Sequence, residues 1–505
     1  MRWIGPLVIA GMLSGAPGCA SAPPAQSPQK EREVILQSED VDLEQEKEIG
    51  RRVAQQVEQE MGLVTDPALL SYVQSIGSRL AAQSPRTEVE YQFQIIDSSD
   101  VNAFALPGGY IYVTRGLLAL TNSEAELANV LAHEVGHVAA RHHSEQQSRA
   151  RNVGILSTVG VLAAAVMGSA EAAQLLAGLT QTVGAGYMAS NGRDQEREAD
   201  ALGQTLAARA GWDPLGMSAF LRTLDRDTEL QIGEKRKTSF LDTHPATPER
   251  VGVTAARARQ LQAGLYEWND MPRDEFLDRI RGIVLGTDPA QGIFEDEAFL
   301  HRDFDLSIRF PNGWLTRNTA STVGAVSQNQ AALIKLELDS RGTDVRQAAT
   351  NFLATLRGRV VRKNGFRIGD LPAYRALVVE GESAVEITWF THQDVIFRLT
   401  GVTAAQKYPR AYERLFKETA ESVRPLRPDE IQRIQRLTLG TALARSGETL
   451  SQFSERTGNQ WSLDETATAN GIFAYDVLKE GQLLKVALAE VYEPDRSARV
   501  EPAGS

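Results

Sequence analysis

The stretch that decides the fold of this chain is residues 123–139, which read SEAELANVLAHEVGHVA. Ser123 and Glu126 have the spacing of a capping box, which predicts that a helix begins here. Within it, His133 and His137 are four residues apart, so a helix places both imidazoles on one face. The stretch therefore predicts a helix that carries a polar cluster inside an apolar run.

The polar cluster has the spacing of a metal site. His133-Glu134-Val135-Gly136-His137 is an HExxH sequence, in which the two histidines can bind one Zn²⁺ and Glu134 faces the water that completes the site. Zinc lowers the pKa of bound water towards about 7 and polarises a carbonyl. Glu134 would accept the water proton and pass it to the leaving amine. The sequence thus predicts one zinc ion per chain and a hydrolytic reaction.

A third protein ligand is needed, and the composition limits what it can be. The chain has one cysteine and seven histidines, which excludes disulfide frameworks and cysteine-rich metal sites. Downstream, Glu196 and Asp200 share a helix face, which makes Glu196 a candidate ligand and Asp200 a candidate acceptor for a ligand histidine's free ring N–H. On spacing alone, Glu198 competes with Glu196 for the metal.

Length and charge set the broad class of protein. The 505 residues suggest about three domains, and 42% hydrophobic residues suffice for buried cores. A formal net charge of −12 argues against a nucleic-acid partner, which would require a basic face.

The amino terminus resembles an export signal. Residues 1–18 combine Arg2 with an apolar run and small residues, which predicts a signal peptide. The sole cysteine, Cys19, lies where a bacterial lipoprotein is cleaved and acylated, and residues 19–39 then form a lipidated tether. The alternative is a plain secretory signal with an incidental cysteine. We expect a membrane anchor at Cys19 and a location on the periplasmic side of the envelope, as an outer-membrane lipoprotein.

Hydrophobic periodicity predicts an α+β fold. Helices are expected at 40–61, 67–83, 123–148, 193–210, 345–357 and 407–422, and strands at 90–97, 103–114, 306–311, 331–338, 373–379 and 384–401. Residues 153–188 are apolar and nearly uncharged, but their first run is shorter than the ~20 residues of a spanning helix. A buried or lid-forming helix pair and a membrane-touching hairpin both remain open for this segment.

These motifs together resemble a known family. The HExxH sequence, the run Glu196-Arg197-Glu198-Ala199-Asp200 and the stretch Asn102–Gly109 (NAFALPGG) are similar to gluzincin metallopeptidases related to the CAAX prenyl endopeptidases, and within them to a BepA-like bacterial lineage. The resemblance covers about residues 40–265. It implies a mainly helical zinc-peptidase domain with a small β-sheet at 40–270, and it implies Glu196, not Glu198, as the third zinc ligand.

The resemblance also suggests roles for other residues. Arg193 matches a common family position and is expected in the outer shell of the site, although Asn191-Gly192 precedes it where the family often has serine. His244, in a His-Pro element, is expected near the metal, where it would stabilise an oxyanion or cap the zinc in a latent state. Zinc peptidases often hold an extended substrate on an edge strand, for which the candidates are Ala103, Phe104, Ala105 and Leu106. His142 and His143 lie off the ligand face and are predicted to be solvated.

Two further domains are expected after the peptidase domain. Residues 290–427 faintly resemble the small Mog1/PsbP-type α+β fold, and without a catalytic cluster they predict a binding or docking domain. Residues 438–490 resemble a small βααβ LysM module, a class that binds N-acetylglucosamine polymers. Peptidoglycan is therefore a candidate partner, and a LysM-shaped structural cap is the alternative.

The sequence thus predicts a zinc-dependent endopeptidase of the cell envelope, whose substrates are misfolded or misassembled envelope proteins. The alternatives are an envelope chaperone and a peptidoglycan-associated scaffold, each with latent protease activity.

Overall fold

The structure is a computed structural model that describes residues 43–142, 191–230, 240–244, 248–264, 267–318, 323–329, 331–356, 358–380, 383–404 and 410–494. The predicted signal peptide, the tether with Cys19 and the apolar segment 153–188 lie outside the described residues. The chain mixes helices and strands, as predicted. Among the helices of the described stretches, none is both long and apolar enough to cross a membrane.

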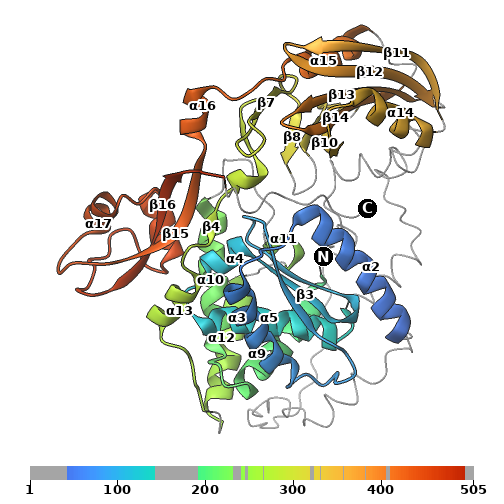
Figure 1. Cartoon of the computed structure of the whole chain (residues 1–505). Helices are drawn as coiled ribbons and strands as arrows, with labels where there is room; N and C mark the ends of the chain where they lie inside the picture. The colour runs from blue at the N-terminus through green and yellow to red at the C-terminus, as the bar shows by residue number, and fades with distance from the viewer. Residues whose placement is uncertain are drawn as a thin grey trace, which may run out of the picture. The chain divides into compact units, whose positions relative to one another are not determined.

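The first domain is built mainly from helices (Figure 1), of which α3, α9 and α10 pack against α5. Its helices are α2 (Leu43–Met61), α3 (Pro67–Ala81), α4 (Arg115–Leu120), α5 (Glu124–Ala139), α9 (Arg193–Arg209), α10 (Leu215–Leu230), α11 (Phe240–Thr243), α12 (Pro248–Gln262) and α13 (Arg273–Ile280). Every residue of α5 is buried. This helix therefore has no solvated face, and its polar side chains must be satisfied inside the protein.

A three-stranded sheet packs beside α5. Its strand order is β1 (Gln92–Ile96), β3 (Tyr110–Thr114), β2 (Ala103–Leu106), with β1 parallel and β2 antiparallel to β3. The hairpin predicted over 103–114 is thus present as β2 and β3, which are joined by a short turn at Pro107–Gly109. The turn needs glycine, because Gly108 has φ +78° and a Cβ on Gly109 would lie 2.5 Å from a Val89 methyl group.

The central helix is shorter than the prediction of a helix to residue 148. It ends at Ala139, and Arg141 adopts a left-handed conformation with φ +56°. At its start, Ser123 Oγ accepts the Glu126 N–H, as predicted for a capping box, but the Glu126 carboxylate accepts from Asn122 N–H one residue earlier. The helix therefore ends shortly after His137, the last residue of the HExxH sequence, and the left-handed residue Arg141 changes the direction of the backbone there.

The second region is a seven-stranded antiparallel sheet with a helix on each face (Figure 1). Its elements are β8 (Leu315–Asn318), β9 (Val323–Val326), β10 (Ala332–Arg341), α14 (Val345–Thr355), β11 (Arg359–Ile368), β12 (Leu371–Glu380), β13 (Ser383–His392), β14 (Val395–Ala404) and α15 (Arg410–Glu421). On β13, Ile387 and Trp389 pack in the cluster under α14, whereas Phe390 packs in the cluster under α15. This alternation gives the sheet two buried faces.

Short elements connect this sheet to its neighbours. They are β4 (Val284–Leu285), β5 (Ile293–Glu295), β6 (Ala298–His301), β7 (Leu306–Arg309) and α16 (Pro428–Arg433). The last unit consists of β15 (Gln435–Leu443), α17 (Leu450–Thr457), α18 (Leu463–Ala469) and β16 (Leu483–Val491). The order β-α-α-β is the one predicted, whereas its relation to LysM domains stays a prediction.

A buried lysine joins this last unit to the peptidase domain. Lys485 on β16 is fully buried, and its Nζ lies 2.9–3.0 Å from the carbonyl oxygens of Ala119, Leu120 and Thr121. These carbonyls end α4, where the helix dipole favours a positive charge. Three carbonyls use all three ammonium protons, so the last unit is fixed to the loop that leads into α5.

Candidate metal centre

Two glycines allow the two helices that carry the candidate ligands to touch. A Cβ on Gly136 of α5 would lie 2.9 Å from the Ala199 carbonyl oxygen of α9. A Cβ on Gly203 of α9 would lie 2.8 Å from the His133 backbone nitrogen. Because real Cβ atoms do not come so close, only glycine permits this backbone contact. The contact brings the HExxH sequence of α5 against the Glu196 face of α9.

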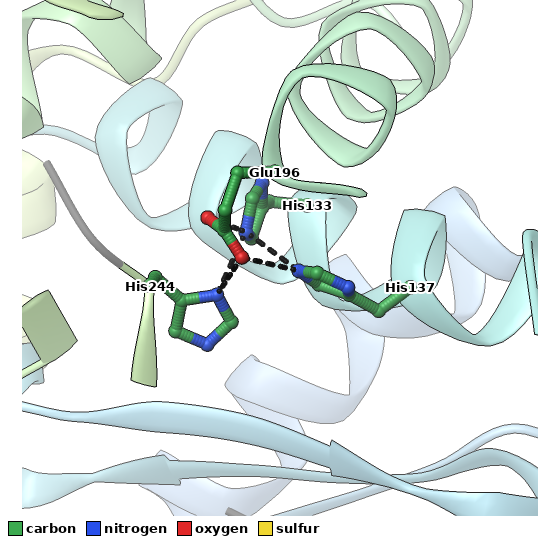
Figure 2. A group of neighbouring side chains, drawn as sticks. All are labelled: His133, His137, Glu196 and His244. Carbon is green, nitrogen blue, oxygen red and sulfur yellow. Dashed lines mark hydrogen bonds and ion pairs between the residues drawn. The ribbon is translucent and has the colours of Figure 1, made fainter. Parts of the chain in front are cut away.

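Four side chains converge between these helices (Figure 2). The ligand atoms of His133, His137, Glu196 and His244 all lie within 4.8 Å of one another, and all four residues are buried. His133 Nε2 is 3.0 Å from His137 Nε2 and 3.5 Å from Glu196 Oε2. Glu196 Oε1 is 3.3 Å from His137 Nε2 and 3.0 Å from His244 Nδ1.

The donor set fits a metal ion. His133 Nδ1 lies 2.9 Å from the Asp200 carboxylate, so its proton is on Nδ1 and the lone pair of Nε2 points into the cluster. His137 Nε2 faces the same cluster, 3.0 Å from His133 Nε2. Ligands about 2.0–2.2 Å from a tetrahedral zinc are about 3.3–3.6 Å apart, which is close to the 3.0–3.5 Å spacings in this cluster. The residues therefore fit Zn²⁺.

An arginine outside the predicted site holds the carboxylates. Arg250 of α12 makes two hydrogen bonds to Asp200, of 2.6 and 2.8 Å, and its Nη1 lies 2.8 Å from Glu196 Oε2. The same nitrogen donates to the His244 carbonyl oxygen at 3.2 Å. Sequence reasoning missed Arg250, because nothing in the local sequence links it to a carboxylate 50 residues away.

Burial and these charges shift the protonation equilibria of the site. Burial raises the pKa of Glu134, and the nearby His244 acts in the opposite direction. Burial also opposes the charged form of His133, but hydrogen bonds to Asp200 and Glu196 raise its pKa to about 9. The pKa of Glu196 is lowered despite burial, because His244 and His133 face it. The Glu196 carboxylate is therefore ionised, whereas burial favours the protonated form of Glu134.

His244 is held over the cluster by its own short helix. Its ring stacks on Phe240 with centroids 4.2 Å apart, and its backbone N–H donates to the Phe240 carbonyl. Its Nε2 lies 3.5 Å from Glu134 Oε1. Asn191 contributes a further polar atom, since its Nδ2 lies 3.4 Å from His244 Nδ1. His244 thus lies at the metal centre, as expected.

Three other residues considered in the sequence analysis lie outside the ligand cluster or are buried against expectation. Arg193 is the first residue of α9 and is exposed, so the structure does not bring it into the site. Glu198, the competing ligand, has 47% of its side chain exposed and does not face the cluster. The prediction that His142 is solvated is wrong, because His142 is buried and its Nδ1 lies 2.8 Å from His137 Nδ1. His143 lies outside the described residues.

The strand predicted to hold substrate is at one end of the three-stranded sheet. β2 pairs with β3 on one side only, and its side chains are buried. Just before it, the Val101 carbonyl accepts the N–H of Phe240, which opens the helix leading to His244. The strand therefore lies beside the metal centre, and its role with substrate stays a prediction.

The helical fold and the buried HExxH cluster together define a metallopeptidase domain. Residues 67–258 match the family model described as Peptidase family M48.

Several known proteins are similar to the chain. It is 31% identical over 222 residues to the "Beta-barrel assembly-enhancing protease" of Yersinia pestis, which is 44% of this chain and 45% of that one. It is 31% identical over 216 residues to the "Mitochondrial metalloendopeptidase OMA1" of Schizosaccharomyces pombe, covering 42% of this chain and 60% of that one. The chain therefore spans about half the length of the curated relatives it matches. A solution structure of cyanobacterial PsbP (CyanoP) from Synechocystis sp. PCC 6803 matches at TM-score 0.23 and 15% identity, over 28% of this chain and 99% of that one.

Proposed function

We propose that this protein is a zinc-dependent endopeptidase of the cell envelope that cleaves misfolded or misassembled envelope proteins. The observation that carries the proposal is the convergence of His133, His137 and Glu196 beside Glu134 in a buried site. These three residues would hold the zinc. A bound zinc supplies Lewis acidity and lowers the pKa of its water.

The residues of the chain then divide the remaining work. Glu134 takes a proton from the attacking water and delivers it to the leaving amine, and its raised pKa suits a group that must hold that proton between the two steps. Asp200 and Arg250 fix the orientation of His133 and Glu196. The edge of β2 pairs with the backbone of an extended substrate.

Zinc content and cleavage of an unfolded protein such as casein test the proposal. The wild type should contain one zinc per chain. Glu134→Gln should keep the zinc and lose about 1,000-fold in cleavage rate, since general acid–base catalysis contributes roughly 10²–10⁴-fold. The matched control is Glu249→Gln, on the surface of α12, which should cleave like the wild type. A wild type without zinc, or an active Glu134→Gln variant, would contradict the proposal.

In the arrangement described here, His244 closes the site. Its Nδ1 lies 3.1 Å from His133 Nε2 and 3.0 Å from Glu196 Oε1, where it would take the fourth position on a tetrahedral zinc. No position is then left for water, so we propose that this is a latent state. His244→Ala should raise the rate of casein cleavage at unchanged zinc content. A lower rate at unchanged zinc content would instead assign His244 to the oxyanion.

The envelope location rests on the sequence of the amino terminus and on the relatives' name, "Beta-barrel assembly-enhancing protease". Cys19 would be acylated and hold the protein at the outer membrane. Cys19→Ser should move the protein from the membrane fraction to the soluble periplasm. In cells, full complementation by Glu134→Gln would favour the alternative, a chaperone or scaffold that does not need proteolysis.

A surface of the last unit supports peptidoglycan as a partner. Phe473 and Tyr475 stack with centroids 5.3 Å apart, and they are 52% and 80% exposed. Exposed aromatic faces offer an apolar platform against which sugar rings can pack. The intact chain should co-sediment with purified peptidoglycan, and Tyr475→Ser should reduce the bound fraction. Equal sedimentation of the two proteins would leave this unit as a structural cap.

A further inference from the structure

The two ligand histidines have different partners behind them. Each imidazole turns one nitrogen towards the cluster and the other away from it. Behind His133, Nδ1 lies 2.9 Å from a carboxylate, that of Asp200. Behind His137, Nδ1 lies 2.8 Å from Nδ1 of another imidazole, that of His142. Because the group behind a metal-bound histidine fixes its ring orientation and tautomer, this difference concerns the metal site itself.

A strained turn places His142 there. After α5 ends, the N–H of Ala140 donates to the Gly136 carbonyl and the N–H of Arg141 donates to the Val138 carbonyl. Arg141 then adopts φ +56°, a left-handed conformation that is unfavourable for a residue other than glycine. The His142 ring packs against the His137 ring at 71°, with centroids 4.9 Å apart. The turn therefore brings a buried imidazole beneath the second ligand.

The direction of the hydrogen bonds follows from the ligand role of His137. With Nε2 facing the metal, His137 carries its proton on Nδ1 and donates it, so His142 Nδ1 must accept. The proton of His142 is then on Nε2, which lies 3.4 Å from Glu198 Oε2. The result is a chain of hydrogen bonds from ligand to imidazole to carboxylate. Glu198 is on α9, the helix that also carries Glu196, and it reaches the surface.

We propose that His142 is a positioning residue for the ligand His137 and that Glu198 selects the tautomer in which His142 accepts. The proposal rests on the zinc site proposed above. It gives a function to the carboxylate that sequence spacing offered as a competing ligand, and it makes the second ligand depend on a partly exposed group. Behind the first ligand, Asp200 and Arg250 form a fully buried equivalent.

Zinc affinity of the full chain, measured by competition with a chelator, tests the proposal. His142→Leu keeps the bulk but has no acceptor, and zinc binding should weaken about 10–100-fold, as is usual when a group behind a ligand is lost. His142→Asn is smaller but keeps an acceptor oxygen, and it should recover most of the affinity. If His142 only fills space, the order reverses, with leucine better than asparagine.

A double-mutant cycle of Glu198 and His142, with zinc affinity as the readout, tests the role of Glu198. Glu198→Gln should weaken zinc binding several-fold, and the double variant with His142→Leu should be no weaker than His142→Leu alone, because the carboxylate acts only through the imidazole. The visible spectrum of the Co²⁺-loaded protein should change in His142→Leu and stay unchanged in the surface control Glu249→Gln. Melting temperatures of the metal-free proteins show whether each variant is folded.

The outcomes separate this inference from the proposed function. A wild type that binds no zinc overturns both proposals. A wild type that binds zinc, together with a folded His142→Leu variant of equal zinc affinity, overturns this inference alone. Additive losses in the double variant also overturn it, since they would mean that Glu198 does not act through His142.

Discussion

The peptidase domain and the seven-stranded sheet both bury charged side chains, but they arrange them differently. In the sheet, arginines form ion pairs with carboxylates of neighbouring strands. Arg398 Nη1 lies 2.7 Å from Asp339, and Arg375 Nε lies 3.4 Å from Glu386. In the peptidase domain, histidines, carboxylates and Arg250 from three helices and a loop face a common point. Buried charge therefore does not by itself mark a site. What marks it is the convergence of several possible ligand atoms within 4.8 Å of one another.

The largest expected effect comes from removing the charge that balances the convergent site. Arg250→Met leaves two ionised carboxylates, Asp200 and Glu196, buried without their cation, which should cost about 3–5 kcal/mol of stability in the metal-free protein. Hydrogen exchange of α9 measures this cost.

The matched control for that variant is Arg398→Met in the sheet, where the arginine is partly exposed and its partners can reach water. It should cost about 1 kcal/mol or less, measured by hydrogen exchange of β13. Equal losses in the two variants would break the comparison, because convergent and local pairs would then be energetically alike.

A smaller effect is expected at Lys485, whose fully buried amine donates to three backbone carbonyls. Lys485→Met leaves these carbonyls without their donor at the end of α4, which should cost about 2–4 kcal/mol. Chemical denaturation of the intact chain gives the value. Protease cleavage between the peptidase domain and the last unit should become faster. A variant as stable and as protease-resistant as the wild type would mean that the two parts do not depend on each other.

The smallest effect is expected at His301, a half-buried histidine at the end of β6. Burial lowers its pKa from 6.5 to about 4, so between these two values the unfolded chain binds more protons than the folded chain. Stability that is present above pH 6.5 is therefore lost as the pH falls towards 4, by about 2 kcal/mol at pH 5. His301→Phe packs against the same neighbours, Phe299 and Phe304, without titrating. Its stability should fall less between pH 7.5 and 5, and an identical fall would exclude His301 as the cause.

Much of the fold follows from sequence periodicity, because local patterns determine local elements. The helices expected at 67–83, 345–357 and 407–422 correspond to α3, α14 and α15. The segment 384–401, which was expected to be extended, forms two strands, β13 and β14, joined by a hairpin turn at Gln393 and Asp394, both of which have positive φ. Such a turn usually contains glycine or asparagine, and only the aspartate here is a partial signal.

The part of the site that depends only on the spacing of residues along one helix could be predicted from the sequence. His133, Glu134 and His137 follow from one helix turn, whereas the choice of Glu196 over Glu198 needed the family resemblance. His142 was missed because an uninterrupted helix would carry it off the ligand face. The left-handed turn at Arg141 could not be predicted, since arginine is not a residue that favours this conformation. Arg250 depends on tertiary packing, which spacing along the chain does not encode.

The contacts that Gly136 makes with Ala199, and Gly203 with His133, have a consequence for which ion the site accepts. Because the backbones of α5 and α9 touch there, the distance between the two halves of the ligand set is fixed by main-chain atoms and not by flexible side chains. A calcium ion, whose bonds are about 2.3–2.6 Å long, would need these ligands further apart than a zinc ion does. The two glycines thus make the site selective for the size of the ion, although neither has a side chain that could touch the metal.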